Sequence, residues 1–252
     1  MVDAIILAGG ENTKRLSSYC SQPYEALIDI AGRPMVTFVA RALAASGRVR
    51  RIFVLGPAAA LADCSFPPGT TVLEGGRTIM DTVRIGAEAL GHSNLVLLAT
   101  ADIPLLTAEA VNHFLHQCSR TEADLYYPIV AAATSEAAYP GVKRTYVRFR
   151  EGTFTGGNLF LANPAILPRC LTLAEEMVAH RKQPLRLCAM LGWSFLARLI
   201  LGRLSLTEVE ERVSHLFDIR GSVVQSPFAE LGIDVDKPSD YELVKSAFAC
   251  KA

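Results

Sequence analysis

The sequence has no excess of charge of either sign. Lysine and arginine together number 25, and aspartate and glutamate also number 25. Nucleic acids and anionic membranes attract proteins with a strongly basic surface, because contacts to phosphate dominate such binding. The charge balance therefore argues against a nucleic acid as partner.

Closely spaced cysteines and long uninterrupted apolar runs are also missing. The longest apolar stretch, residues 187–204, is broken by Trp193-Ser194, Arg198 and Arg203, which makes it a poor membrane span. The start of the chain has no positively charged signal-peptide region. The cysteines form no C-x-x-C pair, which argues against a zinc cluster or a short disulfide framework. We therefore expect a cytoplasmic protein with reduced thiols. The six cysteines are Cys20, Cys64, Cys118, Cys170, Cys188 and Cys250.

The first half of the chain alternates short apolar runs with segments of helical periodicity. This β-α-β alternation is typical of a doubly wound α/β fold with a mostly parallel sheet. The most apolar run, 94–99, is expected to be a central strand. The predicted strands are 4–7, 51–55, 70–73 and 94–99, and the predicted helices are 35–46, 78–90 and 107–119.

The second half is less regular, and 172–217 is expected to be mostly helical, with breaks at Pro184 and Gly202. We predict one domain, 1–252, with a helical insertion at about 172–217. For this apolar insertion the pattern favours core packing or a homo-oligomer interface over an acceptor pocket or membrane contact. The predicted strands here are 125–129, 146–149, 158–161 and 233–235, and Pro238 is expected to open the last helix.

Two glycines follow the first predicted strand, in Leu7-Ala8-Gly9-Gly10. A loop without side chains lets backbone N–H groups approach phosphate oxygens closely. The pattern is neither a Walker A loop nor the G-x-G-x-x-G dinucleotide fingerprint. Taken alone, it fits a plain structural turn equally well.

Three segments near the start decide between these readings: the run 5–10, then Lys14-Arg15-Leu16, then the run 26–35 that ends in Gly-Arg-Pro-Met. Together they resemble the opening of the MobA-like nucleotidyltransferases. The resemblance implies a Rossmann-like, glycosyltransferase-A-type fold, an α/β sandwich of three layers with a mostly parallel sheet. It also implies transfer of an NMP unit from an NTP to a small-molecule acceptor, with Leu7, Ala8, Gly9 and Gly10 at the nucleotide.

Asp102 follows the predicted central strand, in Asp102-Ile103-Pro104. Ligands of open α/β sheets bind at the carboxyl ends of the strands, and Mg²⁺ is usually held by one or two carboxylates. In the resembled family this aspartate is a metal ligand, whereas the alternative is a turn residue before proline. The closing segment 232–241 resembles the family's second metal contact, which falls on Asp236, with Asp234 as a nearby candidate.

The resemblance also implies roles for several binding residues. Arg15, with Lys14, would hold the triphosphate, since a guanidinium binds phosphate through two hydrogen bonds. Gly75 falls where the family contacts base and ribose, and Asn158 falls in the acceptor-side loop. Taken singly, these residues fit a solvated loop charge and a Gly-Gly turn equally well.

Glu25 departs from the family, many members of which have a lysine at this position. A carboxylate beside a triphosphate repels it instead of neutralising it. We predict an Mg²⁺-dependent (or Mn²⁺-dependent) nucleotidyltransferase that releases pyrophosphate. Two alternatives stay open: a glycosyltransferase that uses a nucleotide sugar, and a nucleotide-binding regulatory protein weakened in catalysis. The sequence names neither the NTP nor the acceptor.

Overall fold

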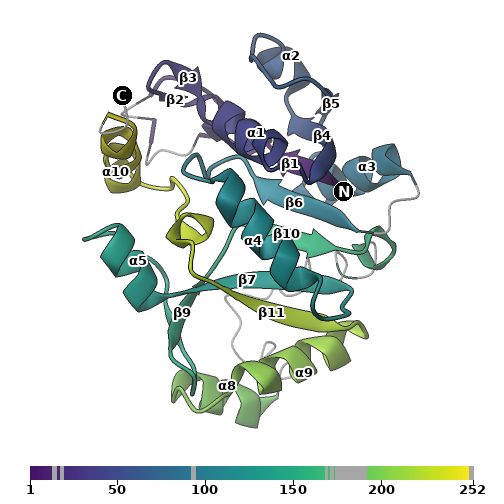
Figure 1. Cartoon of the computed structure of the whole chain (residues 1–252), viewed down its shortest axis with the longest axis vertical. Coiled ribbons are helices and arrows are strands. Elements are labelled where there is room, and N and C mark those ends of the chain that lie inside the picture. The colour runs from purple at the N-terminus through teal and green to yellow at the C-terminus, as the bar shows by residue number, and fades with distance from the viewer. Residues whose placement is uncertain are drawn as a thin grey trace.

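A mixed, mostly parallel sheet forms the centre of the molecule (Figure 1). The computed structural model describes residues 1–12, 16–17, 20–91, 95–167, 170, 173 and 192–249. Along the sheet the strand order is β5-β4-β1-β6-β10-β7-β9-β8, and β11 pairs with the other edge of β7. The strands are β1 Val2–Leu7, β4 Val49–Gly56, β5 Thr70–Glu74, β6 Val96–Thr100, β7 Leu125–Ala131, β8 Val147–Arg148, β9 Thr153–Gly156, β10 Leu159–Ala162 and β11 Gly221–Ser226.

Parallel pairing holds the half of the sheet that contains β1 and β6 together. Strands β5, β4, β1 and β6 are mutually parallel, and β10 runs antiparallel to both β6 and β7. Strand β11 in turn pairs parallel to β7. The carboxyl ends of β1, β4, β5 and β6 therefore meet along one edge of the sheet, which is where open α/β sheets bind ligands.

Helices cover both faces of the sheet, which gives the three layers. Neighbouring residues of a strand point to opposite faces. Accordingly Ala4 and Ile6 of β1 pack with α1 and α4, whereas Ile5 packs with α3 on the other face. The helices are α1 Met35–Ala45, α2 Ala58–Leu61, α3 Ile79–Leu90, α4 Ala108–Cys118, α5 Ala132–Ala138, α8 Trp193–Ile200, α9 Leu206–Phe217 and α10 Pro238–Ala249. The shorter elements are η1 Glu25–Leu27, β2 Asp29–Ile30, β3 Arg33–Pro34, η2 Pro164–Ile166 and η3 Ala229–Gly232.

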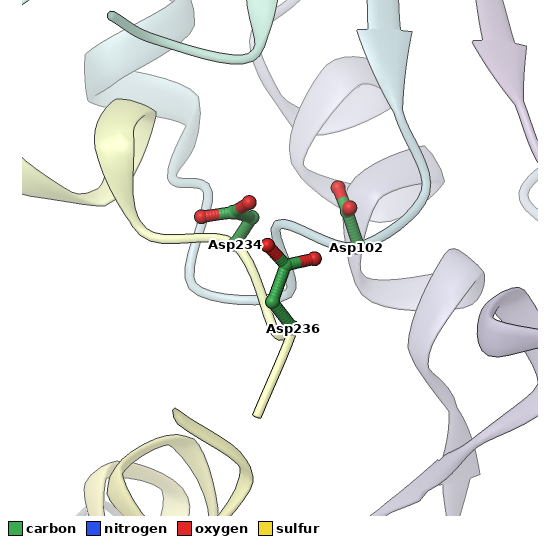
Figure 2. Close-up of side chains that lie close together, drawn as sticks. All are labelled: Asp102, Asp234 and Asp236. Carbon is green, nitrogen blue, oxygen red and sulfur yellow. The ribbon is translucent and has the colours of Figure 1, made fainter. Parts of the chain in front are cut away.

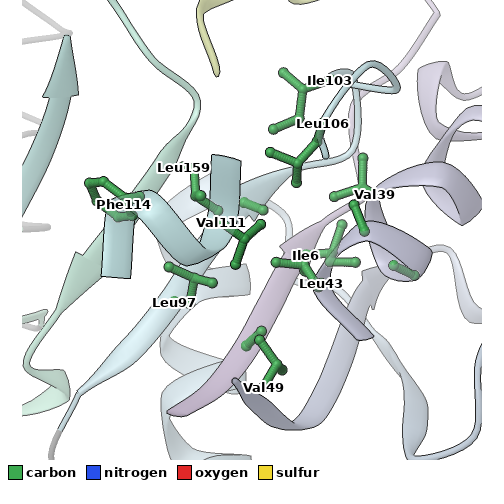
Figure 3. Close-up of a cluster of buried hydrophobic side chains, with 14 of the residues drawn as sticks. Ile6, Val39, Leu43, Val49, Leu97, Ile103, Leu106, Val111, Phe114 and Leu159 are labelled. Carbon is green, nitrogen blue, oxygen red and sulfur yellow. The ribbon is translucent and has the colours of Figure 1, made fainter. Parts of the chain in front are cut away.

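The larger core cluster lies between the sheet and helices α1 and α4 (Figure 3). Phe114 of α4 is among its largest fully buried side chains. We expect Phe114→Ala to lower the free energy of unfolding by about 3–5 kcal/mol, because it removes buried apolar surface and leaves a cavity. Urea denaturation measures this loss. Ile200→Ala, at a side chain that is 83% exposed, is the control and should change stability by less than about 0.5 kcal/mol.

The structure confirms the predicted α/β fold and corrects several elements of the second half. The strand expected at 233–235 is wrong, since these residues form no ladder; Ile233 and Val235 are buried because they pack beneath α10. Elements α5, β9 and β11 were not predicted. Within the expected helical insertion, α8 and α9 are present with a break between them, whereas residues 174–191 lie outside the described part of the chain.

None of the described helices is long and apolar enough to cross a membrane. Among the described cysteines, Cys20, Cys64 and Cys118 are free thiols. Burial raises the pKa of the Cys118 thiol to about 12, so this cysteine stays protonated at neutral pH and fills space in the core.

Candidate active site

A cavity of about 420 Å³ opens at the carboxyl ends of β1 and β6. Its size falls within the usual range for sites that bind small molecules. Three segments far apart in the sequence line it together with Phe160 of β10: the glycine loop with η1, the start of α3, and the loop after β6. The lining residues are Leu7, Ala8, Gly9, Gly10, Glu25, Ala26, Gly76, Arg77, Thr78, Ile79, Thr82, Thr100, Ala101, Asp102 and Phe160.

The glycine loop leaves β1 directly into this cavity. The Ala8 N–H donates to the Leu55 carbonyl of β4 (2.7 Å), which fixes where the loop begins. Gly9 and Gly10 are exposed, and a Cβ on Gly9 would have no neighbour closer than the Gly56 Cα at 4.0 Å. Packing within the described residues therefore does not explain Gly9. The missing side chain leaves room for another molecule to approach the backbone closely.

Glu25 lies beside this loop. Its N–H donates to the Gly10 carbonyl (3.0 Å), and a Cβ on Gly10 would come within 3.1 Å of the Glu25 Oε2. The departure from the family's lysine thus places a carboxylate in the wall of the cavity.

The loop before α3 forms the opposite wall and is fixed by glycines and by Thr82. The Gly75 N–H donates to the Gly56 carbonyl (2.9 Å), and the Gly76 N–H donates to the Thr82 Oγ1 (3.0 Å). A Cβ on Gly76 would lie 2.1 Å from the Asp81 Cβ, so no larger residue fits without moving the helix start. Thr78 caps α3 by accepting from the Asp81 N–H (3.0 Å).

Thr82 supports this wall through a hydroxyl that also donates to the Thr78 carbonyl (2.9 Å). Thr82→Val keeps the shape but leaves the Gly76 N–H without its acceptor. We expect a loss of about 1–2 kcal/mol in the free energy of unfolding, measured by urea denaturation. Thr82→Ser retains the hydroxyl and should lie close to wild type. Equal losses in the two variants would mean that the methyl group, and not the hydrogen bond, holds the loop.

Asp102 stands two residues beyond the end of β6, at the floor of the cavity. The Ala101 N–H donates to the Leu7 carbonyl (3.1 Å), which ties this loop to the glycine loop. The Thr100 hydroxyl donates to the Asp102 carboxylate. The aspartate is therefore held in place by the two central strands.

Asp234 and Asp236 approach Asp102 from the segment that joins η3 to α10, more than 130 residues later in the chain. One carboxylate oxygen from each of the three residues lies within 4.8 Å of the others (Figure 2). The Val235 N–H donates to the Asp102 carbonyl (2.9 Å) and joins the two segments directly. The acids predicted from separate motifs are thus neighbours in space.

The close packing of acids perturbs their protonation. Burial, the largest cause, and the negative charges of Asp234, Asp236 and Glu25 together raise the pKa of Asp102 to about 7, although the hydrogen bond from Thr100 lowers it. Burial also raises the pKa of Asp234, while its ion pair with Arg144 acts in the opposite direction. Carboxylates with raised pKa values in a cavity are typical of functional sites.

Chemically, this group fits a divalent cation. Mg²⁺ and Mn²⁺ prefer oxygen ligands, and Mg²⁺ is commonly held by one or two carboxylates together with substrate phosphates. The three carboxylates supply such ligands next to a cavity that is large enough for a nucleotide. A bound cation would also relieve the mutual repulsion of the acids.

The remaining predicted residues are placed less directly. Lys14 and Arg15 lie outside the residues that the structure describes. Gly75 does not line the cavity but supports the wall behind it. Asn158 lies beside the end of β6, where its carbonyl accepts from the Thr100 N–H (3.2 Å) and its N–H donates to the Leu231 carbonyl (2.8 Å).

Some residues of the site were not predicted from the sequence. Gly76, Arg77 and Thr78 line the cavity, and the signal that pointed to Gly75 extends to them. Arg144 contacts Asp234, and only its place in a short basic pair with Lys143 sets it apart in the sequence. Phe160 lines the cavity from β10, and nothing in its local pattern distinguishes it from a core residue.

Comparison with known protein families matches residues 4–193, which are 190 of the 252 residues, to the MobA-like NTP transferase domain. The chain belongs to the MobA-like NTP transferase family. It is therefore an enzyme of the nucleotidyltransferase class, as the sequence predicted.

Two solved structures are similar to this MobA-like chain. A hypothetical transferase from Thermus thermophilus is 38% identical with a TM-score of 0.84, over 96% of this chain and 100% of that one. A CMP:2-keto-3-deoxy-manno-octonic acid synthetase solved with CTP is 14% identical with a TM-score of 0.62, over 100% of both chains. The second likeness shows the fold alone.

A curated relative is the bifunctional protein GlmU of Rhodospirillum rubrum. It is 32% identical over 114 residues, which are 44% of this chain and 25% of that protein. The match thus spans about a quarter of that relative's length.

Proposed function

We propose that this MobA-like transferase moves an NMP unit from an NTP to a small-molecule acceptor in a reaction that depends on Mg²⁺ or Mn²⁺. The observation that carries the proposal is the convergence of Asp102 and Asp236 beside the glycine-loop cavity. Together they supply oxygen ligands for a cation where the phosphates of a nucleotide would lie.

In the proposed reaction the acceptor oxygen attacks the α-phosphorus of the NTP in line with the leaving group. A new P–O bond forms to the acceptor, the bond between the α-phosphorus and the bridging oxygen breaks, and pyrophosphate leaves with the electron pair. The acceptor is a phosphate or a hydroxyl; a hydroxyl gives up its proton during the attack. The cation, when bound, offsets negative charge that develops on the phosphate oxygens.

The chain's own residues divide the remaining work in this proposal. The backbone of Leu7, Ala8, Gly9 and Gly10 holds the nucleotide, and Lys14 and Arg15 hold the triphosphate. Asp102 and Asp236 would hold the cation. Gly75 supports the wall for base and ribose, and Asn158 faces the acceptor. We further propose that the protein acts in the cytoplasm, and its oligomeric state stays open.

A thermal-shift series with ATP, GTP, CTP and UTP, each with and without Mg²⁺, tests the proposal. A ligand present at about 100 times its Kd stabilises the folded state by about 2.7 kcal/mol. We expect one NTP to raise the melting temperature only when Mg²⁺ is present, which identifies the donor. A shift with nucleotide sugars and none with any NTP would favour a glycosyltransferase instead.

One observation favours a second function, a nucleotide-binding regulatory protein with weakened catalysis: Glu25 lines the cavity where many family members have a lysine. Under this alternative, Glu25→Lys raises the rate of pyrophosphate release, whereas an enzyme adapted to Glu25 loses activity. A pyrophosphate-release assay of the two proteins therefore separates the two functions.

Glu25 also allows a prediction on nucleotide affinity. We expect Glu25→Gln to tighten NTP binding about fivefold, because removing a nearby negative charge relieves roughly 1 kcal/mol of repulsion. Glu11→Gln is the matched control, since Glu11 is exposed and does not line the cavity. Isothermal titration with the NTP found by thermal shift measures both variants. Unchanged affinity in Glu25→Gln would mean that its carboxylate does not face the phosphates.

A further inference from the structure

Arg144 is a buried cation next to the aspartates. Only 6% of its side chain is exposed, although it belongs to the segment between α5 and β8 and lies outside the regular elements. A guanidinium keeps its charge at every physiological pH, so burying one requires acidic partners. The partners of Arg144 are the acids of the closing segment.

The contacts of Arg144 centre on Asp234. Its Nη1 donates to the Asp234 carboxylate, and its Nη2 donates to the Asp234 carbonyl (2.6 Å). The Nη2 also lies 3.6 Å from the Asp240 carboxylate, which is itself 2% exposed. One oxygen of Asp234 is therefore already occupied by a positive charge.

Asp236 is held in a different way. Its N–H and that of Lys237 each donate to the Asp240 Oδ2 (3.2 Å), so the backbone of Asp236 is fixed while its side chain is exposed. No salt bridge to Asp236 occurs among the residues that the structure describes. Of Asp234 and Asp236, Asp234 is paired with Arg144, whereas the carboxylate of Asp236 has no such ion pair among the described residues and is available to a cation.

We propose that Arg144 withholds Asp234 from the cation, so that Asp102 and Asp236 alone supply the protein ligands. This inference rests on the proposed function, because it concerns the ligand set of the same cation. Two carboxylates bind Mg²⁺ weakly, and the ion then needs phosphate oxygens from the nucleotide to complete its shell. Arg144 is thus a positioning residue that makes cation binding depend on the NTP.

Mn²⁺ binding without nucleotide, followed through the electron paramagnetic resonance signal of free Mn²⁺, tests the inference. We expect Asp236→Asn to weaken binding by about tenfold or more, as loss of a ligand does. Asp234→Asn should change the Kd by less than about twofold, because the amide oxygen still accepts from Arg144. An equal loss in the two variants would overturn the role assigned to Arg144.

The variant Arg144→Gln provides the converse test. It frees Asp234, so we expect nucleotide-independent Mn²⁺ binding to tighten about fivefold or more. The double variant Arg144→Gln/Asp234→Asn should lose this gain, whereas Arg144→Lys, which keeps the charge, should stay near wild type. A purely structural role would weaken Mn²⁺ binding in Arg144→Gln and overturn the inference. If Arg144→Gln does not fold, the comparison of Asp234→Asn with Asp236→Asn decides alone.

The proposed function and this inference are refuted by different results. If wild-type protein binds no Mn²⁺ even with each of the four NTPs present, the cation site itself is refuted. If wild type binds Mn²⁺ and Asp234→Asn weakens binding as much as Asp236→Asn, the site stands and only the role of Arg144 is refuted.

Discussion

Replacing Asp102 by asparagine is expected to lower the rate of pyrophosphate release at saturating Mg²⁺ by about 10²–10³-fold. The same variant should be more stable than wild type in the absence of metal at pH 8. The two effects have one cause. Asp102 is a carboxylate placed among other carboxylates, and this arrangement suits a cation but strains the cation-free fold.

The size and pH range of the stability effect follow from the pKa. Folding raises the pKa of Asp102 from its usual 3.8 to about 7. The protonated carboxyl of Asp102 favours the folded state. This contribution to the free energy of unfolding is complete below pH 3.8, and it is lost as the pH rises through 7. Each unit of pKa corresponds to about 1.4 kcal/mol, so asparagine should stabilise the metal-free protein at pH 8 by at most about 4 kcal/mol.

Urea denaturation in EDTA, at pH 4 and at pH 8, measures this difference between variant and wild type. We expect almost no difference at pH 4 and a clear gain for Asp102→Asn at pH 8. Asp63→Asn is the control, because Asp63 is exposed and does not line the cavity. A variant that is both fully active and no more stable would show that Asp102 serves neither as ligand nor as a source of strain.

Affinity for the cation should depend steeply on pH below 7. A proton and a metal ion compete for the same carboxylate, and the pKa of Asp102 is raised to about 7. We therefore expect the apparent Kd for Mn²⁺ to increase about tenfold for each pH unit below 7, and to level off above it. Between pH 7 and pH 5.5 the expected loss of affinity is about sixteenfold, because half of the Asp102 carboxyl groups are already protonated at pH 7.

Mn²⁺ titrations of the nucleotide-free protein between pH 5.5 and 8 test this dependence. The residual binding of Asp102→Asn is the internal control and should lack the steep dependence, because the amide does not titrate. A flat affinity in the wild-type protein across this range would contradict a role for the Asp102 carboxylate as ligand.

The fold of the first half could be predicted because its central strands β1, β4 and β6 are largely buried on both faces. A parallel strand such as β6 is read as one unbroken apolar run, and Thr78 and Thr107 mark where the next helices begin. The second half gave weaker signals. Strand β11, Gly221–Ser226, has a single apolar pair, and among the described strands it pairs only with β7. Its position therefore depends on tertiary contacts that the local sequence does not encode.

The same distinction applies to the site. Asp102 and Asp236 could be predicted because each follows a motif that resembles a family pattern. The ion pair between Arg144 and Asp234 joins residues 90 positions apart and depends on how the segment after α5 packs against η3 and α10. Residues 233–235 were mistaken for a strand because burial beneath α10 produces the same apolar pattern.

The central claim is that Asp102 and Asp236 together hold the cation that accompanies the NTP. A crystal structure with Mn²⁺ and a non-hydrolysable analogue of the NTP found by thermal shift tests it most directly, using anomalous diffraction to locate the metal. The account predicts one manganese peak about 2.0–2.2 Å from a carboxylate oxygen of each residue, with phosphate oxygens completing its shell. A nucleotide bound in the glycine-loop cavity with no manganese between these two carboxylates would contradict it.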